Sequence, residues 1–254
     1  MFLQEMPSFR VLNCLTTFLA LSIFGITISA SIVNWYTLSE QITLVPQATG
    51  SSTAATSDTL LYNRTDVAWT LQQRTTSTYF DRKQTSVATS YSSDHAIFSI
   101  LKLVQAFAIT ALLLSGILSI YFTLVFFAGF RAKIVYSWGA TGARRIAMLT
   151  SLFVVISVVI AFLATTGITN ALKTDNPVCV DGPCNKFVDP QTTSLGTYTH
   201  IGVVYNMNSN MTWGPAAGWF LFLACIPLSL LLTIIAGLNN YPIPIDSIGS
   251  GEAL

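Results

Sequence analysis

Residues Thr212–Asn240 read TWGPAAGWFLFLACIPLSLLLTIIAGLNN, and this stretch decides the fold class. Its opening, WGPAAGW, contains two Trp, two Gly and a Pro, and no catalytic or metal-ligating side chain accompanies it. An apolar run without a charge follows. At ~1.5 Å per residue, about 24 helical residues reach roughly 36 Å, which exceeds the hydrocarbon thickness of a bilayer. The stretch therefore predicts a membrane-spanning helix over 213–238, with Pro215 in its first turn.

Three further apolar runs cover 11–33, 96–130 and 146–172, and only Lys102 interrupts them with a charge. The chain is 52% hydrophobic and 9% charged, whereas soluble domains carry roughly 25% charged residues. A cleaved signal peptide is the alternative for the first run, but that run exceeds the ~7–15 apolar residues typical of such peptides. We expect a membrane all-α protein, a four-helix transmembrane bundle with all four spans retained.

The loop 131–145 carries four cations and no acid, which decides the expected orientation. Short loops rich in Lys and Arg stay on the cytoplasmic side. The termini, 1–10 and 239–254, are then cytoplasmic, and the segments 34–95 and 173–212 face outward or into a lumen. The predicted location is the plasma membrane or an endomembrane. The four cations are Arg131, Lys133, Arg144 and Arg145.

The two outer segments contain strand-like stretches separated by turn-forming residues. β-Branched and aromatic residues predict strands at Gln41–Val45, Val67–Gln72 and Ser77–Phe80, and another in YTHIGVVYNM, residues 198–207. Residues 48–59, rich in Ser, Thr and Ala, predict a loop. We therefore expect a small extracellular β-sheet formed by both outer loops.

Cysteines and sequons support the outward placement of these segments. Cys179 and Cys184 flank the turn Asp181-Gly182-Pro183, so a local disulfide is expected, and a metal site lacks further ligands nearby. Asn63 and Asn210 begin N-x-T sequons for glycosylation, although Asn210 stands close to the fourth span. Cys14 and Cys225 fall inside spans and are expected to be small buried residues, with lipidation an alternative for Cys14 near the cytoplasmic end.

Small residues recur along the spans at helical spacing. Such ridges let membrane helices approach closely, either within one bundle or between subunits. No acid, His or Arg interrupts a span, which argues against a transporter. If the protein conducts, the pore must form between copies, with a polar strip on the second span. The expected packing positions are Ser22, Gly25, Ser29, Ala108, Ala111, Ser115 and Ser119, and the strip is Thr110, Ser115, Ser119 and Thr123.

The sequence contains no motif for catalysis, a cofactor, a metal or nucleic acid. His95 and His200 are isolated, and the net charge is only +1. We therefore expect no enzyme activity, no cofactor and no nucleic-acid partner. Asp94-His95 precedes the second span and is read as a polar cap, with a pH-sensing or ion-binding role as the alternative.

The layout of four spans, a larger first outer loop and a smaller second one resembles the claudin and peripheral-myelin-protein superfamily. Trp35 follows the first span directly, as the first outer Trp does in that family. GPAAGWFLFLACIPLSLLLTIIAG is similar to the start of that family's last helix. Claudins also carry a Gly-Leu-Trp motif and a Cys pair in the first outer segment, which here has no Cys.

The resemblance implies a function based on contact with other molecules: adhesion, barrier formation or association with another membrane protein as an auxiliary subunit. We expect lateral assembly through the extracellular sheet, with lipid and either further copies or another membrane protein as partners. The alternatives are a pore-forming subunit of an oligomeric channel and an auxiliary subunit. The tail Glu252-Ala253-Leu254 is faintly similar to a PDZ ligand. Trp35, Trp213 and Trp219 are expected to anchor the chain at the membrane interface.

Overall fold

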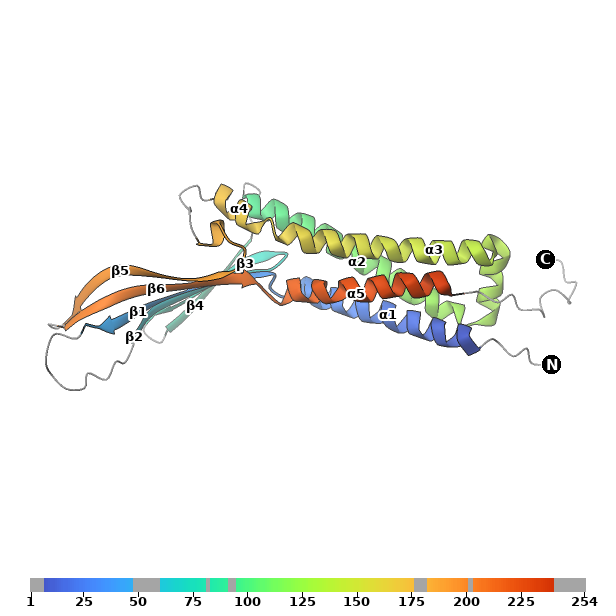
Figure 1. Cartoon of the computed structure of the whole chain (residues 1–254), viewed down its shortest axis with the longest axis horizontal. Helices are drawn as coiled ribbons and strands as arrows, with labels where there is room; N and C mark the ends of the chain where they lie inside the picture. Colours follow the sequence, from blue (N-terminus) through green and yellow to red (C-terminus); the bar gives the residue numbers. More distant parts are fainter. Residues whose placement is uncertain are drawn as a thin grey trace, which may run out of the picture. The chain divides into compact units, whose positions relative to one another are not determined.

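The computed structural model describes residues 7–47, 60–80, 83–90, 95–175, 182–200 and 203–239. Figure 1 shows their helices and strands along the chain. The helices are α1 (Pro7–Ile32), α2 (Ala96–Val125), α3 (Ala128–Thr165), α4 (Ile168–Asp175) and α5 (Ala217–Leu238), with a 3₁₀ turn, η1, at Gly182–Cys184. The strands are β1 (Tyr36–Pro46), β2 (Leu60–Trp69), β3 (Gln73–Phe80), β4 (Lys83–Ser90), β5 (Asp189–His200) and β6 (Val203–Pro215).

Four of these helices, α1, α2, α3 and α5, are long and apolar enough to cross a membrane. Their most apolar windows have mean hydropathies of 2.0, 2.2, 2.8 and 2.5. The expected fold class, four packed membrane helices with a small sheet built from both connecting segments, is confirmed. The chain is therefore an integral membrane protein with four candidate spans.

One compact unit contains residues 7–31, 104–163 and 220–239 and is the helix bundle. The side chain of Asn13 in α1 donates a 3.0 Å hydrogen bond to the Phe122 carbonyl of α2. Gly116 of α2 is small enough to take the Phe24 ring of α1 against its backbone. Because lipid provides no hydrophobic driving force, such close contacts and hydrogen bonds hold membrane helices together.

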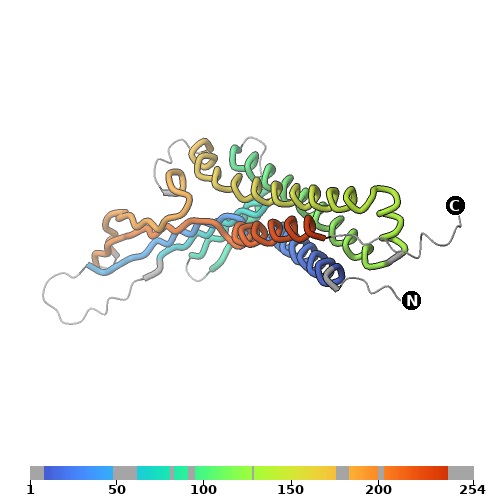
Figure 2. The backbone as a smooth tube through the Cα atoms, turned by 45° about the vertical axis from the view of Figure 1, so that its right-hand side comes forward, coloured from blue at the N-terminus to red at the C-terminus, as the bar shows by residue number. Residues whose placement is uncertain are grey.

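The basic segment 131–145, expected to be a loop, is helical and belongs to α3. A kink interrupts α3 at Gly139, whose φ of 69° lies in the left-handed region that glycine adopts without strain. The short helical part before the kink turns sharply away from the long part, as Figure 2 shows. Its inner side packs with α1 and α2 in a cluster made of Phe9, Val125, Ile134, Val135 and Ala143.

The second compact unit contains the described residues of 32–103 and 164–219, including the whole sheet. The sheet is antiparallel throughout, in the order β4-β3-β2-β1-β6-β5. The pair β1–β6 joins the two long segments that connect the spans, in register from Tyr36 opposite Pro215 to Pro46 opposite Tyr205. Bulges interrupt the ladder at Tyr62 in β2, opposite the step from Ile42 to Thr43 in β1, and at Leu195 in β5.

Three expectations about the strands were wrong in detail. Residues 198–207 do not form one strand, because β5 ends at His200 and β6 begins at Val203. The strand expected over 67–72 ends at Trp69, where Thr70 starts a turn by accepting the N–H groups of Gln72 and Gln73 on its hydroxyl. Pro215 ends β6 rather than starting the last helix, which begins at Ala217.

Candidate interaction surface

One face of the sheet presents almost only polar side chains. Residues that pair directly across strands point to the same face, so the register places Ser39, Asp66, Ser77 and Ser86 in one row across β1 to β4. The neighbouring row on that face contains Gln41, Arg64, Tyr79 and Gln84. The sequence supplies this face through the Thr-, Ser- and Gln-rich segments that connect the spans, and such a surface is well suited to solvent or to a polar partner.

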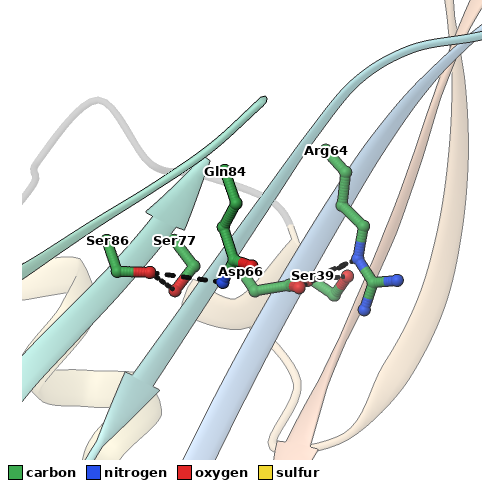
Figure 3. Close-up of polar contacts among 6 residues, drawn as sticks. All are labelled: Ser39, Arg64, Asp66, Ser77, Gln84 and Ser86. Carbon is green, nitrogen blue, oxygen red and sulfur yellow. Dashed lines mark hydrogen bonds and ion pairs between the residues drawn. The ribbon is translucent and has the colours of Figure 1, made fainter. Parts of the chain in front are cut away.

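Hydrogen bonds run along these two rows, as Figure 3 shows. The Ser39 hydroxyl donates to Asp66 at 2.6 Å, and the Arg64 Nε lies 2.9 Å from the same carboxylate. The hydrogen bond from Arg64 to Asp66, followed by their charge attraction, raises the pKa of the Arg64 guanidinium. In β3 and β4, Ser77 and Ser86 share a 2.9 Å hydrogen bond. The Ser39–Asp66 and Ser77–Ser86 bonds join side chains of paired strands and so support the cross-strand register, whereas the Arg64–Asp66 contact lies within β2.

The opposite face carries aromatic side chains and one hydrogen-bonded polar pair. The ring of Tyr62 contacts Phe80 edge-on at 5.7 Å and Tyr198 at 6.3 Å between centroids. These three rings come from β2, β3 and β5, and all three are exposed. Ser209, which is buried, donates a 2.8 Å hydrogen bond to Glu40. This face therefore offers a contact surface with both apolar and polar groups.

The two outer strands of the sheet are β4 and β5, and each pairs with a neighbour on one side only among the described strands. All eight residues of β4, and residues 190–199 of β5, are exposed. An outer strand leaves a row of N–H and C=O groups open to pairing with another chain. Strand β5 carries Pro190 and a bulge at Leu195, both of which discourage such pairing at those points. Strand β4 carries neither a Pro nor a bulge.

A cluster of aromatic rings packs at the end of the sheet where β1 begins. Tyr36 is fully buried between Trp69 and Phe187, with centroids 5.8 and 5.6 Å away. Its hydroxyl donates a 3.0 Å hydrogen bond to the Phe187 carbonyl, and Trp213 Nε1 donates one of 2.8 Å to the Lys186 carbonyl. Burial raises the pKa of the Tyr36 phenol. The cluster thus ties the segment after η1 to β1 and β6.

The first turn of α5 is fixed against the backbone that precedes β1. The N–H of Ala216 donates to the Trp35 carbonyl at 3.0 Å, and that of Gly218 to the Asn34 carbonyl at 2.8 Å. Trp35 is fully buried, and Trp213 is 5% exposed. Both rings are packed inside the protein, so they are not available to the membrane interface as expected, while Trp219 is half-buried beside Phe187.

The N-terminus of α2 is capped by Asp175 of α4 rather than by a neighbour in sequence. Its carboxylate accepts the N–H groups of Ala96 at 2.5 Å and Ile97 at 3.0 Å. His95 Nδ1 stands 3.9 Å from the same carboxylate. Asp94, the other half of the expected cap, lies outside the described residues. An acid at a helix N-terminus satisfies free N–H groups and complements the helix dipole.

The small residues expected to pack the spans divide into two groups. In α2, Ala108, Ala111 and Ser115 are fully buried, and Ser119 is 5% exposed. In α1, Gly25 and Ser29 are exposed, and Ser22 is half-buried. The buried small and polar side chains of α1 are instead Asn13, Thr16, Ala20, Thr27 and Ala30. Sequence spacing identified a stripe on α1, but it did not say which stripe faces inward.

The hydroxyls of the expected polar strip bond within their own helix. Thr110, Ser115, Ser119 and Thr123 donate to backbone carbonyls three or four residues earlier in α2. Ser115 and Ser119 are also buried inside the bundle.

The expected modification sites lie in or beside the sheet. Asn63 is in the interior of β2, and Asn210 in β6 accepts a 2.9 Å hydrogen bond from Thr192 on its side-chain oxygen. Cys184 is buried in η1. Cys179 lies outside the described residues, so the disulfide stays a prediction. Cys225 is buried in α5 as expected, whereas Cys14 is exposed on α1, so the expectation of burial was wrong for Cys14.

The four cations of 131–145 have different surroundings. Arg131 is 3% exposed and lies over the Phe9 ring at 4.9 Å. Lys133 and Arg145 are exposed, while Arg144 is half-buried. Within the described ranges, no three His, Cys, Asp or Glu side chains are grouped so that they could hold a metal ion.

Comparison with known proteins adds no relative. No protein-family model matches the chain, and no curated protein matches it.

Proposed function

We propose that this chain is a non-enzymatic four-span membrane protein that assembles laterally through its sheet, in a structural, adhesive or barrier role like that of claudins. The observation that carries the proposal is the pair of exposed outer strands, β4 and β5. The layout of spans and outer segments, which resembles the claudin superfamily, supports the same role. The sheet has few means of blocking further pairing, and β4 has the fewest.

The direction of the strands favours assembly between copies that lie in one membrane. Neighbouring strands alternate in direction, and the sheet has an even number of strands, six. Its two outer strands, β4 and β5, therefore run in opposite directions. Copies with the same orientation can place β4 of one beside β5 of the next and continue an antiparallel sheet. Such a head-to-tail contact generates either a closed ring or an open row.

The proposal is tested by engineered cross-links and by native mass measurement in mild detergent. One variant carries Ser86→Cys on β4 together with Thr192→Cys on β5, two positions that the register places on the same face of the sheet. We expect disulfide-linked ladders of several copies, because each copy contributes one cysteine at each edge. The controls are the two single-cysteine variants, Ser86→Cys alone and Thr192→Cys alone, which can form dimers at most through the engineered thiols. A particle that is strictly monomeric and carries no partner would contradict the proposal.

The same measurement separates the alternatives. An auxiliary subunit would co-purify with a different membrane protein in fixed ratio rather than with further copies of itself. For the proposed role, no hydrolytic or redox activity is required, and the purified protein should assemble without any added cofactor.

A further inference from the structure

The bend between α2 and the long part of α3 presents a surface of aromatic and basic side chains. We propose that this surface, made of Lys133, Tyr136, Trp138 and Arg145, binds the headgroups of anionic phospholipids in the adjoining leaflet. We call these four residues the elbow surface. The inference is independent of assembly through the sheet, since all four residues belong to the helix bundle.

The elbow surface is held rigidly from its inner side. Ile134 and Val135 are each 8% exposed and pack with Phe9 and Val125 of α1 and α2. The kink at Gly139 then separates this short helix from the apolar part of α3. This short helix packs against the protein on one side, is polar on the other side, and is bent away from the direction of the span. Such a helix is suited to the membrane surface rather than to the membrane core.

The same helix exposes residue types that favour a headgroup layer. Tyr136, on the side opposite Ile134 and Val135, is 94% exposed, and Trp138, next to the kink, is 53% exposed. Lys133 stands one helical turn before Tyr136 and is exposed, as is Arg145 beyond the kink. Tyr and Trp rings prefer the level of the headgroups, and Lys and Arg side chains reach phosphates there.

The charge of this region selects anionic over neutral lipids. Residues 95–174 contain six Lys and Arg and not a single Asp or Glu, so the stretch that includes the elbow surface supplies no carboxylate to neutralise it. A cation close to an anionic leaflet strengthens association by roughly five-fold. Lys133 and Arg145 together therefore give a preference of about 25-fold at low ionic strength.

Brominated lipids test this inference in the full-length protein, since bromine quenches tryptophan only at short range. The protein is reconstituted in phosphatidylcholine vesicles containing an equal fraction of either brominated phosphatidylserine or brominated phosphatidylcholine. The signal of Trp138 is the difference between the parent protein and Trp138→Phe. We expect phosphatidylserine to quench this signal more strongly, and the excess to fall by an order of magnitude in Lys133→Gln/Arg145→Gln.

The matched control is Lys102→Gln/Lys173→Gln, which removes the same charge from two exposed lysines of the other compact unit. It should retain the full excess. Equal quenching by both lipids, an excess that survives in Lys133→Gln/Arg145→Gln, or an equal loss in the control would each overturn the inference. Inorganic phosphate that abolishes the excess at the same charge concentration as phosphatidylserine would also overturn it, because the surface would then bind any anion.

Discussion

Gly218 is the residue on which the start of the last span depends. A Cβ built on it would lie 2.8 Å from Trp35 Cδ1 and Nε1 and 2.9 Å from Cε2. Trp35 is fully buried, so its indole has no room to move aside. We expect Gly218→Ala to lower the free energy of unfolding by about 1–3 kcal/mol, the usual cost of overpacking.

A matched control for this change is available in another span. A Cβ on Gly25 of α1 would meet nothing within 4 Å, so Gly25→Ala should leave stability unchanged or raise it slightly through helix propensity. Thermal unfolding of both variants in one detergent compares them. Equal melting temperatures would show that the Trp35 ring does shift to accept a methyl group.

Tyr36 makes the sheet sensitive to alkaline pH. Burial raises the pKa of its phenol above the ordinary value of about 10. Because the folded state keeps the proton that the unfolded state releases, stability is complete below pH ~10 and falls above it, by about 1.4 kcal/mol per pH unit. The loss continues until the pH reaches the raised pKa of the folded state.

The variant Tyr36→Phe isolates this effect. It loses the hydrogen bond to the Phe187 carbonyl, which costs about 1 kcal/mol at neutral pH. Its stability should then change less than that of the parent protein between pH 9 and pH 11, measured by denaturant unfolding at each pH. Parallel curves for the two proteins across that range would contradict the role assigned to Tyr36.

At the scale of elements, the start of α2 depends on Asp175, which lies at the end of α4. Its carboxylate accepts two N–H groups of the first helical turn, and its side chain is 14% exposed. Asp175→Ala should cost about 1 kcal/mol, as the loss of an N-cap does. Hydrogen exchange at the amides of Ala96 and Ile97 should accelerate. The control is Asp189→Ala, which removes the partner of Lys186 at a more exposed site and leaves exchange at α2 unchanged.

The element boundaries show what a single sequence can predict. The four spans were predictable because a run of ~20 apolar residues has few other stable states. The β6–α5 junction was not, because Pro215 suits the first turn of a helix and also the end of a strand. The segment 131–145 was predicted to be a loop because of its charges, yet it is helical, and only the kink at Gly139 interrupts the helix. Local composition does not report that the inner side of this helix packs against α1.

At the scale of the whole chain, the contacts that define the sheet are far apart in sequence. The hydrogen bond from Ser209 to Glu40 joins residues 169 positions apart, and β1 pairs with β6 along its whole length. The sequence predicted strands in both outer segments, but neither their order nor their register follows from one chain. The same limit explains why the edge strand β4 was not predicted. Its sequence, KQTSVATS, has a single aliphatic β-branched residue, and its position at the edge of the sheet depends on the topology.

Proline substitutions in β4 test whether that edge carries the assembly. Along an outer strand, successive backbone N–H groups point alternately to the neighbouring strand and to the open side. One of the two changes Val87→Pro and Ala88→Pro therefore removes an N–H donor on the open side of β4. The other removes a bond to β3 and should lower the melting temperature. The outward variant should keep the melting temperature close to that of the parent protein and yet reduce the mass of the assembly in mild detergent. If neither proline changes that mass while one of them leaves the fold intact, the copies do not join through β4, and the exposed aromatic face of Tyr62, Phe80 and Tyr198 becomes the surface to substitute next.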